Sequence, residues 1–219
     1  HGTAVGMPSD DDMGNSEVGH NAIGAGQVYS QGAALVADAI ASGAIWEGEA
    51  WQQIVAGAKA GRGTIHFIGL FSDGNVHSHI DHLKAMVVQA KAEGLKTVRI
   101  HALLDGRDVP ETSALDYVIP FETFLTEIST DGFDARIASG GGRQNITMDR
   151  YDANWSMVDK GWKTHVLGEG QQFPNAVAAV NALREQNPGT IDQDLPPFVI
   201  GEKGKPIGTI EDGDSVVFF

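Results

Sequence analysis

The strongest constraint on the fold is an alternation of apolar, β-branched runs with segments whose apolar residues recur at helical spacing. Runs of the first kind cover 64–71, 98–104 and 135–139, and a polar loop and a helical pattern follow each of them. After the first run, Ile80 and Val87 lie on one face of the expected helix. Strands that alternate with helices are typical of α/β domains. The sequence therefore predicts a mainly parallel sheet flanked by helices.

Further elements are expected on both sides of these three units. Turn residues from Pro8 to Asn15 precede Ser16, which places Ser16 at or near the start of a helix. The glycine run before Arg143 is expected to be a loop. The other helical patterns cover 32–42, 46–59, 113–129, 149–160 and 175–186, and later strands are expected at 198–200 and 215–219.

Charge and composition narrow the classes of function. The 29 acidic and 15 basic side chains give a formal net charge of −14, which opposes broad attraction to nucleic acid or to an anionic membrane. A phosphorylated ligand would therefore need a local cluster of arginines. The absence of cysteine excludes disulfides and thiolate chemistry. No signal peptide or bilayer-spanning apolar run is recognisable, so a cytoplasmic protein is expected.

Three polar loops directly follow the three predicted strands. They comprise 72–79, 105–108 and the stretch that begins at Gly142. In an open parallel sheet, the loops at the carboxyl ends of the strands surround one crevice, and ligands bind there. Asp and Gly also form ordinary turns, and arginines are often only solvated. Their repetition at equivalent positions favours a site in which Arg107, Arg143 and Arg150 hold a small dianionic substrate.

The histidines of the first loop allow two interpretations. His77, His79 and His82 are spaced closely enough to share one metal ion. However, no carboxylate at helical spacing completes such a site, because Asp81 would point elsewhere on a helix. The favoured interpretation is that His77 donates a hydrogen bond to substrate, and that His79 and His82 are cap and helix-surface residues.

Ser16 is a candidate for covalent phosphorylation. A hydroxyl at a helix N-terminus faces free backbone N–H groups that would stabilise an attached phosphate. The alternative is an ordinary N-cap serine. A serine hydroxyl also needs a base or a metal to become a nucleophile, and no activator is evident beside Ser16 in the sequence. Asp10, Asp11 and Asp12 are interpreted as turn formers rather than as a metal cage.

Five motifs follow one another in an order that matches a known family, and together they cover essentially the whole chain. They are Pro8-Ser9-Asp10-Asp11-Asp12-Met13-Gly14-Asn15-Ser16-Glu17-Val18-Gly19-His20, Ser72-Asp73-Gly74-Asn75-Val76-His77-Ser78-His79, Asp105-Gly106-Arg107-Asp108-Val109-Pro110, Gly140-Gly141-Gly142-Arg143 and Met148-Asp149-Arg150-Tyr151. In these motifs the chain resembles the cofactor-independent phosphoglycerate mutases, and the spacing from the glycine run to Arg150 resembles the plant and trypanosomatid branch.

The resemblance implies two domains. Residues 1–31 would be a segment of an alkaline-phosphatase-like α/β domain, and 32–219 would form the inserted phosphotransferase domain, truncated at its C-terminus. Two divalent metal ions, usually manganese, would have their other ligands outside this chain, and 2,3-bisphosphoglycerate would not be needed. The resemblance further implies that Ser16 accepts the phosphoryl group and coordinates a metal, that Asp108 exchanges a proton with the glycerate hydroxyls, and that His77, Arg107, Asp108, Arg143 and Arg150 bind the substrate.

The leading hypothesis is therefore part of an enzyme, monomeric when complete, that interconverts 2-phosphoglycerate and 3-phosphoglycerate. The chain alone is expected to be inactive, since both ends look cut and the family's arginine-rich segment after Phe219 is absent. Asn75 replaces a usual glycine and Gln27 a common arginine, which is expected to alter loop conformation more than chemistry. One alternative is a non-catalytic α/β module that binds small phosphorylated acids, and another is a metal-dependent phosphohydrolase or phosphopentomutase relative.

Overall fold

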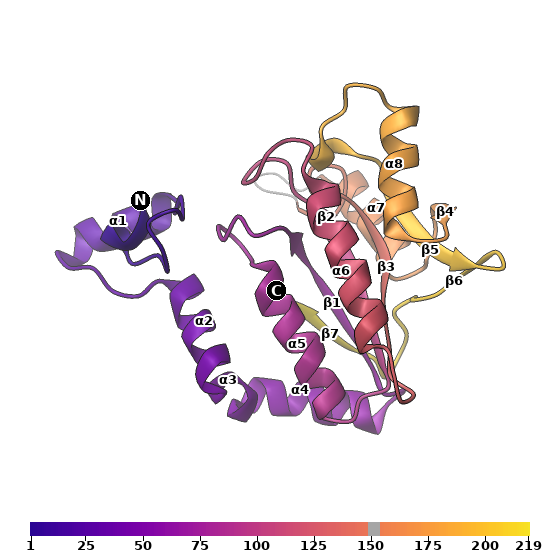
Figure 1. Ribbon diagram of the computed structural model, residues 1–219, viewed down its shortest axis with the longest axis horizontal. Coiled ribbons are helices and arrows are strands. Elements are labelled where there is room, and N and C mark those ends of the chain that lie inside the picture. Colours follow the sequence, from indigo (N-terminus) through magenta and orange to yellow (C-terminus); the bar gives the residue numbers. More distant parts are fainter. Residues whose placement is uncertain (149–153) are drawn as a thin grey trace.

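The computed structural model describes residues 1–148 and 154–219, and its centre is a mainly parallel sheet (Figure 1). Within the described residues the strand order is β4-β5-β3-β2-β1-β7, with β6 paired to β5. The pairings of β1 with β2 and β7, of β2 with β3 and of β4 with β5 are parallel, whereas β5 runs antiparallel to β3 and β6. The predicted fold class is confirmed. The strands are β1 Thr64–Phe71, β2 Thr97–Leu104, β3 Asp134–Gly142, β4 Gln171–Phe173, β5 Phe198–Glu202, β6 Lys205–Pro206 and β7 Ser215–Phe218.

The helices agree with the sequence pattern in most bounds. The predicted helix at 46–59 divides at Gly48. The one predicted at 149–160 begins at Trp155, with Asn154 as its N-cap, and ends at His165, while 149–153 lie outside the described residues. None of the described helices combines the length and apolarity that a bilayer crossing requires. The helices are η1 Gly2–Val5, α1 Ser16–Ala25, α2 Gly32–Ser42, α3 Ala44–Glu47, α4 Glu49–Ala60, α5 Ile80–Ala92, α6 Ala114–Ile128, α7 Trp155–His165, α8 Ala176–Gln186 and η2 Asp192–Asp194.

The two faces of the sheet differ in character. Ile65 and Phe67 of β1 point to a large apolar core covered by α4, α5, α6 and α8, of which α5 and α6 lie in front of the sheet in Figure 1. Alternate residues of a strand point to opposite faces, so His66 and Ile68 lie on the other side. There the apolar cluster is smaller, and α7 packs against β3. The second face therefore has a partly polar interior.

The glycine run before Arg143 belongs to β3, which corrects the prediction that the strand ends at Ser139 and a loop begins at Gly140. A Cβ on Gly140 would lie 2.6 Å from the ring of Phe198, and one on Gly142 would lie 2.2 Å from the carbonyl oxygen of Gln193. Glycine therefore lets β5 and the residues around η2 approach β3 closely.

A buried carboxylate organises the start of α6. Asp192 is fully buried, and its Oδ2 accepts a hydrogen bond of 2.8 Å from the backbone N–H of Ala114. Its Oδ1 accepts one of 2.6 Å from Nη2 of Arg184 on α8. Because Ser113 makes no side-chain cap, this distant carboxylate satisfies an N-terminal donor of α6.

The N-terminal segment lies to one side of the sheet domain (Figure 1). Its apolar residues Ile23, Val28 and Leu35 do not form a core face, because α1 ends at Ala25 and all three side chains are exposed, Ile23 by 81%. The side chain of Asn75 joins this segment to the loop after β1, since its Nδ2 donates to Oδ1 of Asp12 at 2.8 Å. Asn75 adopts a left-handed φ of 56°, which asparagine tolerates, and a glycine would lack this contact.

Candidate functional site

The carboxyl ends of three parallel strands lie in line. Phe71 of β1 pairs with Leu104 of β2, and Leu104 pairs with Gly142 of β3. The loops that leave these ends therefore start side by side, with Ser72 and Asp105 as the first residues of two of them. This is the edge at which the sequence predicted a crevice, and open α/β sheets bind ligands there.

Asp105 fixes the conformation of the second loop. Its side chain is buried, and Oδ2 accepts a hydrogen bond of 2.6 Å from the hydroxyl of Ser72. Oδ1 accepts from the backbone N–H groups of Arg107 at 3.0 Å and Asp108 at 3.1 Å. A carboxylate that bonds to backbone groups two and three residues ahead holds a turn in one shape. The backbone at Arg107 and Asp108 is therefore held from within the domain.

Arg143 is the predicted arginine whose side chain is buried at this edge of the sheet. Its side chain is only 5% exposed, and Nη1 donates to Oδ1 of Asp105 at 3.0 Å and to Oδ2 of Asp108 at 2.6 Å. Its Nε is buried and has no hydrogen-bond partner among the described residues. A buried charge is tolerated when it is paired, and an unpaired buried N–H costs about 1–3 kcal/mol. The guanidinium of Arg143 is thus held in place by two carboxylates, and its Nε–H remains available to donate a hydrogen bond.

The other two predicted arginines differ from Arg143. Arg107 is exposed, and its guanidinium has no partner in the described part of the chain. Arg150 lies outside the described residues, so the structure does not place it. Of the predicted substrate-binding set, the structure thus brings Arg143 and Asp108 into direct contact, with Arg107 on the same loop.

A tyrosine ties the first loop to α6. The hydroxyl of Tyr117 donates a hydrogen bond of 2.6 Å to Oδ1 of Asp73. Burial, together with the neighbouring Asp73 carboxylate, raises the pKa of Tyr117 above its usual value. The phenol therefore stays protonated at neutral pH and remains a donor to this loop.

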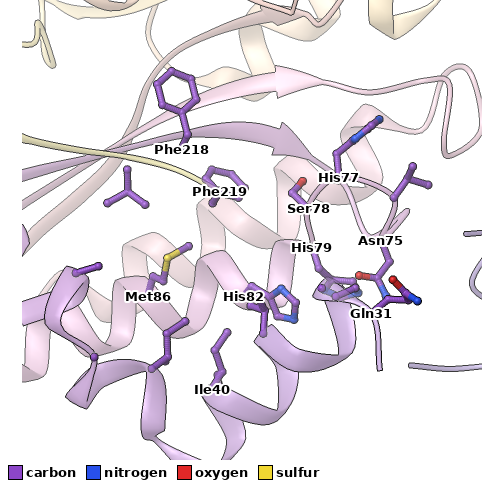
Figure 2. Close-up of a pocket in the computed structure, with 18 of the residues that line it drawn as sticks. Gln31, Ile40, Asn75, His77, Ser78, His79, His82, Met86, Phe218 and Phe219 are labelled. Carbon is purple, nitrogen blue, oxygen red and sulfur yellow. The ribbon is translucent and has the colours of Figure 1, made fainter. Parts of the chain in front are cut away.

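His77, His79 and His82 do not form a metal site. Figure 2 shows the ring of His77 pointing away from those of His79 and His82. Across the described ranges, no three His, Asp or Glu side chains converge on a position that could hold an ion. His79 caps α5 through its Nδ1, which accepts from the N–H of Asp81 at 3.1 Å, as predicted. Burial and the nearby His79 lower the pKa of His82, which is half-buried rather than a surface residue.

A large cavity lies away from Arg143, which is not among its wall residues. It has a volume of about 750 Å³, and its walls come from the N-terminal segment, α2 to α5 and the end of β7 (Figure 2). His77 lines this cavity, and no contact joins it to Arg143 or Asp108 within the described residues. The described walls contain no lysine or arginine. Any countercharge for a dianionic ligand would have to come there from histidines, whereas the edge with Arg143 supplies a permanent cation.

Ser16 is the first residue of α1 but not its cap. Oδ1 of Asn15 accepts from the N–H of Val18 at 3.1 Å, so Asn15 is the N-cap and the interpretation of Ser16 as an ordinary N-cap is wrong. Ser16 is exposed, and its hydroxyl has no hydrogen-bond partner in the part of the chain that the structure describes. The aspartates before it make local turn contacts, as Asp12 does with Ser9 at 2.8 Å.

Sequence reasoning missed a chain of buried polar side chains on the second face of the sheet. It links the carboxylate of Asp214 to the hydroxyl of Thr147 through three histidines and a serine. The successive distances are Asp214 Oδ2 to His66 Nε2 3.2 Å, His66 Nδ1 to His101 Nε2 2.9 Å, His101 Nδ1 to Ser139 Oγ 2.7 Å, Ser139 Oγ to His165 Nδ1 2.8 Å, and His165 Nε2 to Thr147 Oγ1 3.0 Å. A histidine inside each of two apolar strands was the signal that could have revealed it.

Comparisons with known proteins agree with the fold. The chain is 61% identical to a probable 2,3-bisphosphoglycerate-independent phosphoglycerate mutase of Leptospira interrogans, over all of this chain and 40% of that protein. It is 51% identical to the corresponding proteins of Trypanosoma brucei brucei and Arabidopsis thaliana, over all of this chain and 40% and 39% of their lengths. The chain thus spans about 40% of the length of these curated relatives.

A solved structure and a family model point the same way. The structure of Leishmania mexicana phosphoglycerate mutase, determined at low cobalt concentration, superposes with a TM-score of 0.95 at 50% identity, over 99% of this chain and 40% of that one. The family model described as the BPG-independent PGAM N-terminus matches residues 36–219. Together with the fold and the motifs along the chain, these matches show that the protein belongs to the 2,3-bisphosphoglycerate-independent phosphoglycerate mutase family.

Proposed function

We propose that this chain supplies the substrate-binding part, and the phosphorylated serine, of an enzyme that interconverts 2-phosphoglycerate and 3-phosphoglycerate. The observation that carries the proposal is the buried contact of Arg143 with Asp105 and Asp108 at the aligned strand ends. The relatives' names add that such enzymes are independent of 2,3-bisphosphoglycerate. In this proposal the reaction belongs to glycolysis and gluconeogenesis. A cytoplasmic location and, for the complete enzyme, a monomeric state are proposed as well, as expected from the sequence.

Arg143 and Asp108 would divide the chemistry between them. The guanidinium of Arg143 is already oriented by two carboxylates, so binding an anion would cost little further ordering. Asp108 is half-buried and keeps one oxygen free of its 2.6 Å contact with Arg143. In this proposal that oxygen exchanges a proton with the glycerate hydroxyls. Arg107, and by resemblance His77 and Arg150, would complete the contacts to phosphate and carboxylate.

Ser16 would accept the phosphoryl group and return it to the other hydroxyl of the glycerate. Its hydroxyl needs activation, and the described residues place no group of metal ligands beside it. The nearby imidazole of His20 has its Nδ1 2.7 Å from the backbone carbonyl oxygen of Ser16, and no contact joins it to the hydroxyl within the described residues. The relative solved with cobalt supports a metal requirement for the family. We therefore propose that the ligands of two divalent ions, Mn²⁺ foremost, lie outside these 219 residues except for Ser16. The division into 1–31 and 32–219 is proposed on the same basis.

A non-catalytic module is the second candidate, and the absence of a converging group of metal ligands among the described residues favours it for the isolated chain. In that case Arg143 would capture phosphorylated acids without turnover. The two functions make the same prediction for binding and opposite ones for catalysis once the rest of the fold is supplied. Calorimetric titration of the 219-residue chain with 3-phosphoglycerate, with ribose 5-phosphate as the comparison ligand, tests binding and its specificity.

The catalytic proposal needs a chimaera. Residues 1–219 can replace the matching part of the Leishmania mexicana relative, because the two superpose closely. Turnover would be followed by coupling to enolase, and Ser16→Ala should abolish it while the control Ser9→Ala retains it. Arg143→Lys should weaken 3-phosphoglycerate binding by at least about tenfold, since lysine lacks the planar guanidinium whose Nη1 contacts both carboxylates while other donors remain for a ligand. Arg136→Lys at the far end of β3 should not weaken binding.

Three results would contradict the proposal. Turnover by the 219-residue chain alone with Mn²⁺ would show that the activating groups lie within it. A chimaera that binds 3-phosphoglycerate but keeps full activity in the Ser16→Ala variant would remove the phosphoserine step. A tighter interaction with ribose 5-phosphate than with 3-phosphoglycerate would favour the phosphopentomutase alternative.

A further inference from the structure

The buried chain from Thr147 to Asp214 can carry its hydrogen bonds in one direction only. Asp214 contacts Arg62 and, as a carboxylate, can only accept, so Nε2 of His66 must donate to it. Burial lowers the pKa of His66, of His101 and of His165, so each ring is neutral and has one donor and one acceptor nitrogen.

The remaining protons follow from this first one. Nδ1 of His66 has no proton and accepts from Nε2 of His101, and Nδ1 of His101 then accepts from the hydroxyl of Ser139. The oxygen of Ser139 accepts from Nδ1 of His165, which leaves Nε2 of His165 to accept from the hydroxyl of Thr147. Every ring nitrogen and both hydroxyls of the chain have a partner in this arrangement, and Thr147 is its terminal donor. Only Oδ1 of Asp214 has no hydrogen-bond partner among the described residues.

The sheet is shaped to make the chain continuous. His66 and His101 lie on adjacent strands and point to the same face. The pairing of β2 with β3 shifts by one residue between Ile100 and His101. Ser139 of β3, and not Ala138, therefore lies opposite His101. A bulge of this kind redirects a side chain and is found where a specific orientation is needed.

Thr147 is held in an unfavourable backbone conformation at the end of this chain. Its φ is 74°, a value that is rare for a β-branched residue. Such strain persists only where surrounding contacts enforce it. Two contacts do so: the bond to His165, and the close approach of α7 at Gly161, where a Cβ would lie 2.7 Å from Oγ1 of Thr147.

Thr147 and Arg143 belong to the same short turn. The backbone N–H groups of Asn145 and Ile146 both donate to the carbonyl of Gly142, at 2.8 and 3.1 Å. Ile146 is fully buried, so the turn cannot slide along the sheet. The turn is therefore fixed at one end by the pairing of Arg143 with its carboxylates and at the other by the hydroxyl of Thr147.

We propose that Thr147 is a positioning residue for Arg143, and that the buried chain of His66, His101, Ser139 and His165 holds it in place. This inference rests on the proposed role of Arg143 in binding the phosphoglycerate. A purely structural role for Thr147 would depend on the shape of its side chain. A positioning role through the chain depends on its hydroxyl, which is the terminal donor, and this difference makes the two roles separable.

The first test reads the protons directly in the 219-residue chain. Long-range ¹H–¹⁵N spectra of the labelled protein at pH 7 distinguish the two neutral tautomers of an imidazole from its charged form. The expected result is a proton on Nε2 in His66 and His101 and on Nδ1 in His165. A charged ring at any of the three, or a proton on Nε2 of His165, would overturn the proposal without reference to any ligand.

The second test separates hydroxyl from shape. Thr147→Val keeps the branched shape and removes the donor, whereas Thr147→Ser keeps the donor. Thr164→Val is the matched control, because Thr164 is a buried threonine whose hydroxyl donates to the carbonyl of Lys160, at 2.8 Å, outside the chain that ends at Thr147. The readouts are the Nε–H signal of Arg143 and the affinity for 3-phosphoglycerate.

We expect Thr147→Val to shift or broaden the Nε–H signal of Arg143 and to weaken 3-phosphoglycerate binding by about tenfold. A loss of this order corresponds to one charge-assisted hydrogen bond from Arg143 to the ligand. Thr147→Ser and Thr164→Val should stay within about twofold of the unmodified chain. Equal effects of Thr147→Val and Thr147→Ser, or no change in either, would overturn the inference. If the unmodified chain binds no 3-phosphoglycerate, the proposed function fails, and the Arg143 signal still decides whether Thr147 positions it.

Discussion

Acidification from pH 7 to pH 4 should destabilise this protein through its buried histidines. His165 is 3% exposed, and its burial lowers its pKa to about 4 from the usual 6.5. In the unfolded chain the same ring binds a proton below about pH 6.5. Between these two pKa values the unfolded state binds a proton that the folded state does not bind. The free energy of unfolding therefore falls as the pH falls.

The magnitude follows from the two pKa values. A difference of about 2.5 pKa units, at about 1.36 kcal/mol per unit, corresponds to about 3 kcal/mol of stability. The loss begins below about pH 6.5 and levels off below about pH 4, where the folded state also binds the proton. Since domains of this size are stable by only about 5–15 kcal/mol, the effect is large enough to measure. Burial also lowers the pKa of His101 well below its usual value, which adds a loss in the same direction.

Urea unfolding followed by tryptophan fluorescence at several pH values between 7 and 4 measures this loss. Carboxylates titrate in part of the same window, so the informative quantity is the difference between the unmodified chain and His165→Asn. Asparagine keeps a donor near the position of Nδ1 and removes the titrating ring. The variant should be less stable at pH 7 and should lose about 3 kcal/mol less on acidification. Thr164→Val, which removes a buried hydroxyl but no titrating group, should keep the full pH dependence. An identical pH dependence in His165→Asn and the unmodified chain would refute the reasoning.

Three further changes test other parts of the structure. Asp192→Asn should reduce the free energy of unfolding by about 2–3 kcal/mol in urea titration, because it leaves the charge of Arg184 without its buried partner; an unchanged midpoint would contradict this. Gly140→Ala should cost about 1–3 kcal/mol in the same assay, since the added methyl group would collide with the ring of Phe198 and overpack the strand; a stabilised variant would show that the ring can move aside. Asn75→Ala removes the link to the N-terminal segment and places alanine at a left-handed φ, so limited proteolysis should cut that segment about fivefold faster, and an unchanged cleavage rate would show that other contacts hold it.

Much of the site's location could be predicted, but less of its internal structure. Strand ends and polar loops are local signals, so Asp108 and Arg143 were expected at the edge of the sheet at which they lie. The sequence did not indicate that Asp105 would fix the backbone of the second loop or that Arg143 would be buried between two carboxylates. The histidine triplet shows the opposite error, because close spacing in sequence does not make side chains converge: the ring of His77 points away from His79.

The sequence by itself determined the elements whose causes are local. The apolar run at 64–71 and the helical pattern at 32–42 have the bounds that were predicted, because side-chain period and flanking glycines act over a few residues. The tertiary structure alone decided which distant groups meet. Arg143 reaches Asp105 across 38 positions, and His66 reaches Asp214 across 148. Such contacts depend on strand order, register and a bulge in β3, which are set by how the whole sheet packs, and no short window of sequence contains that information.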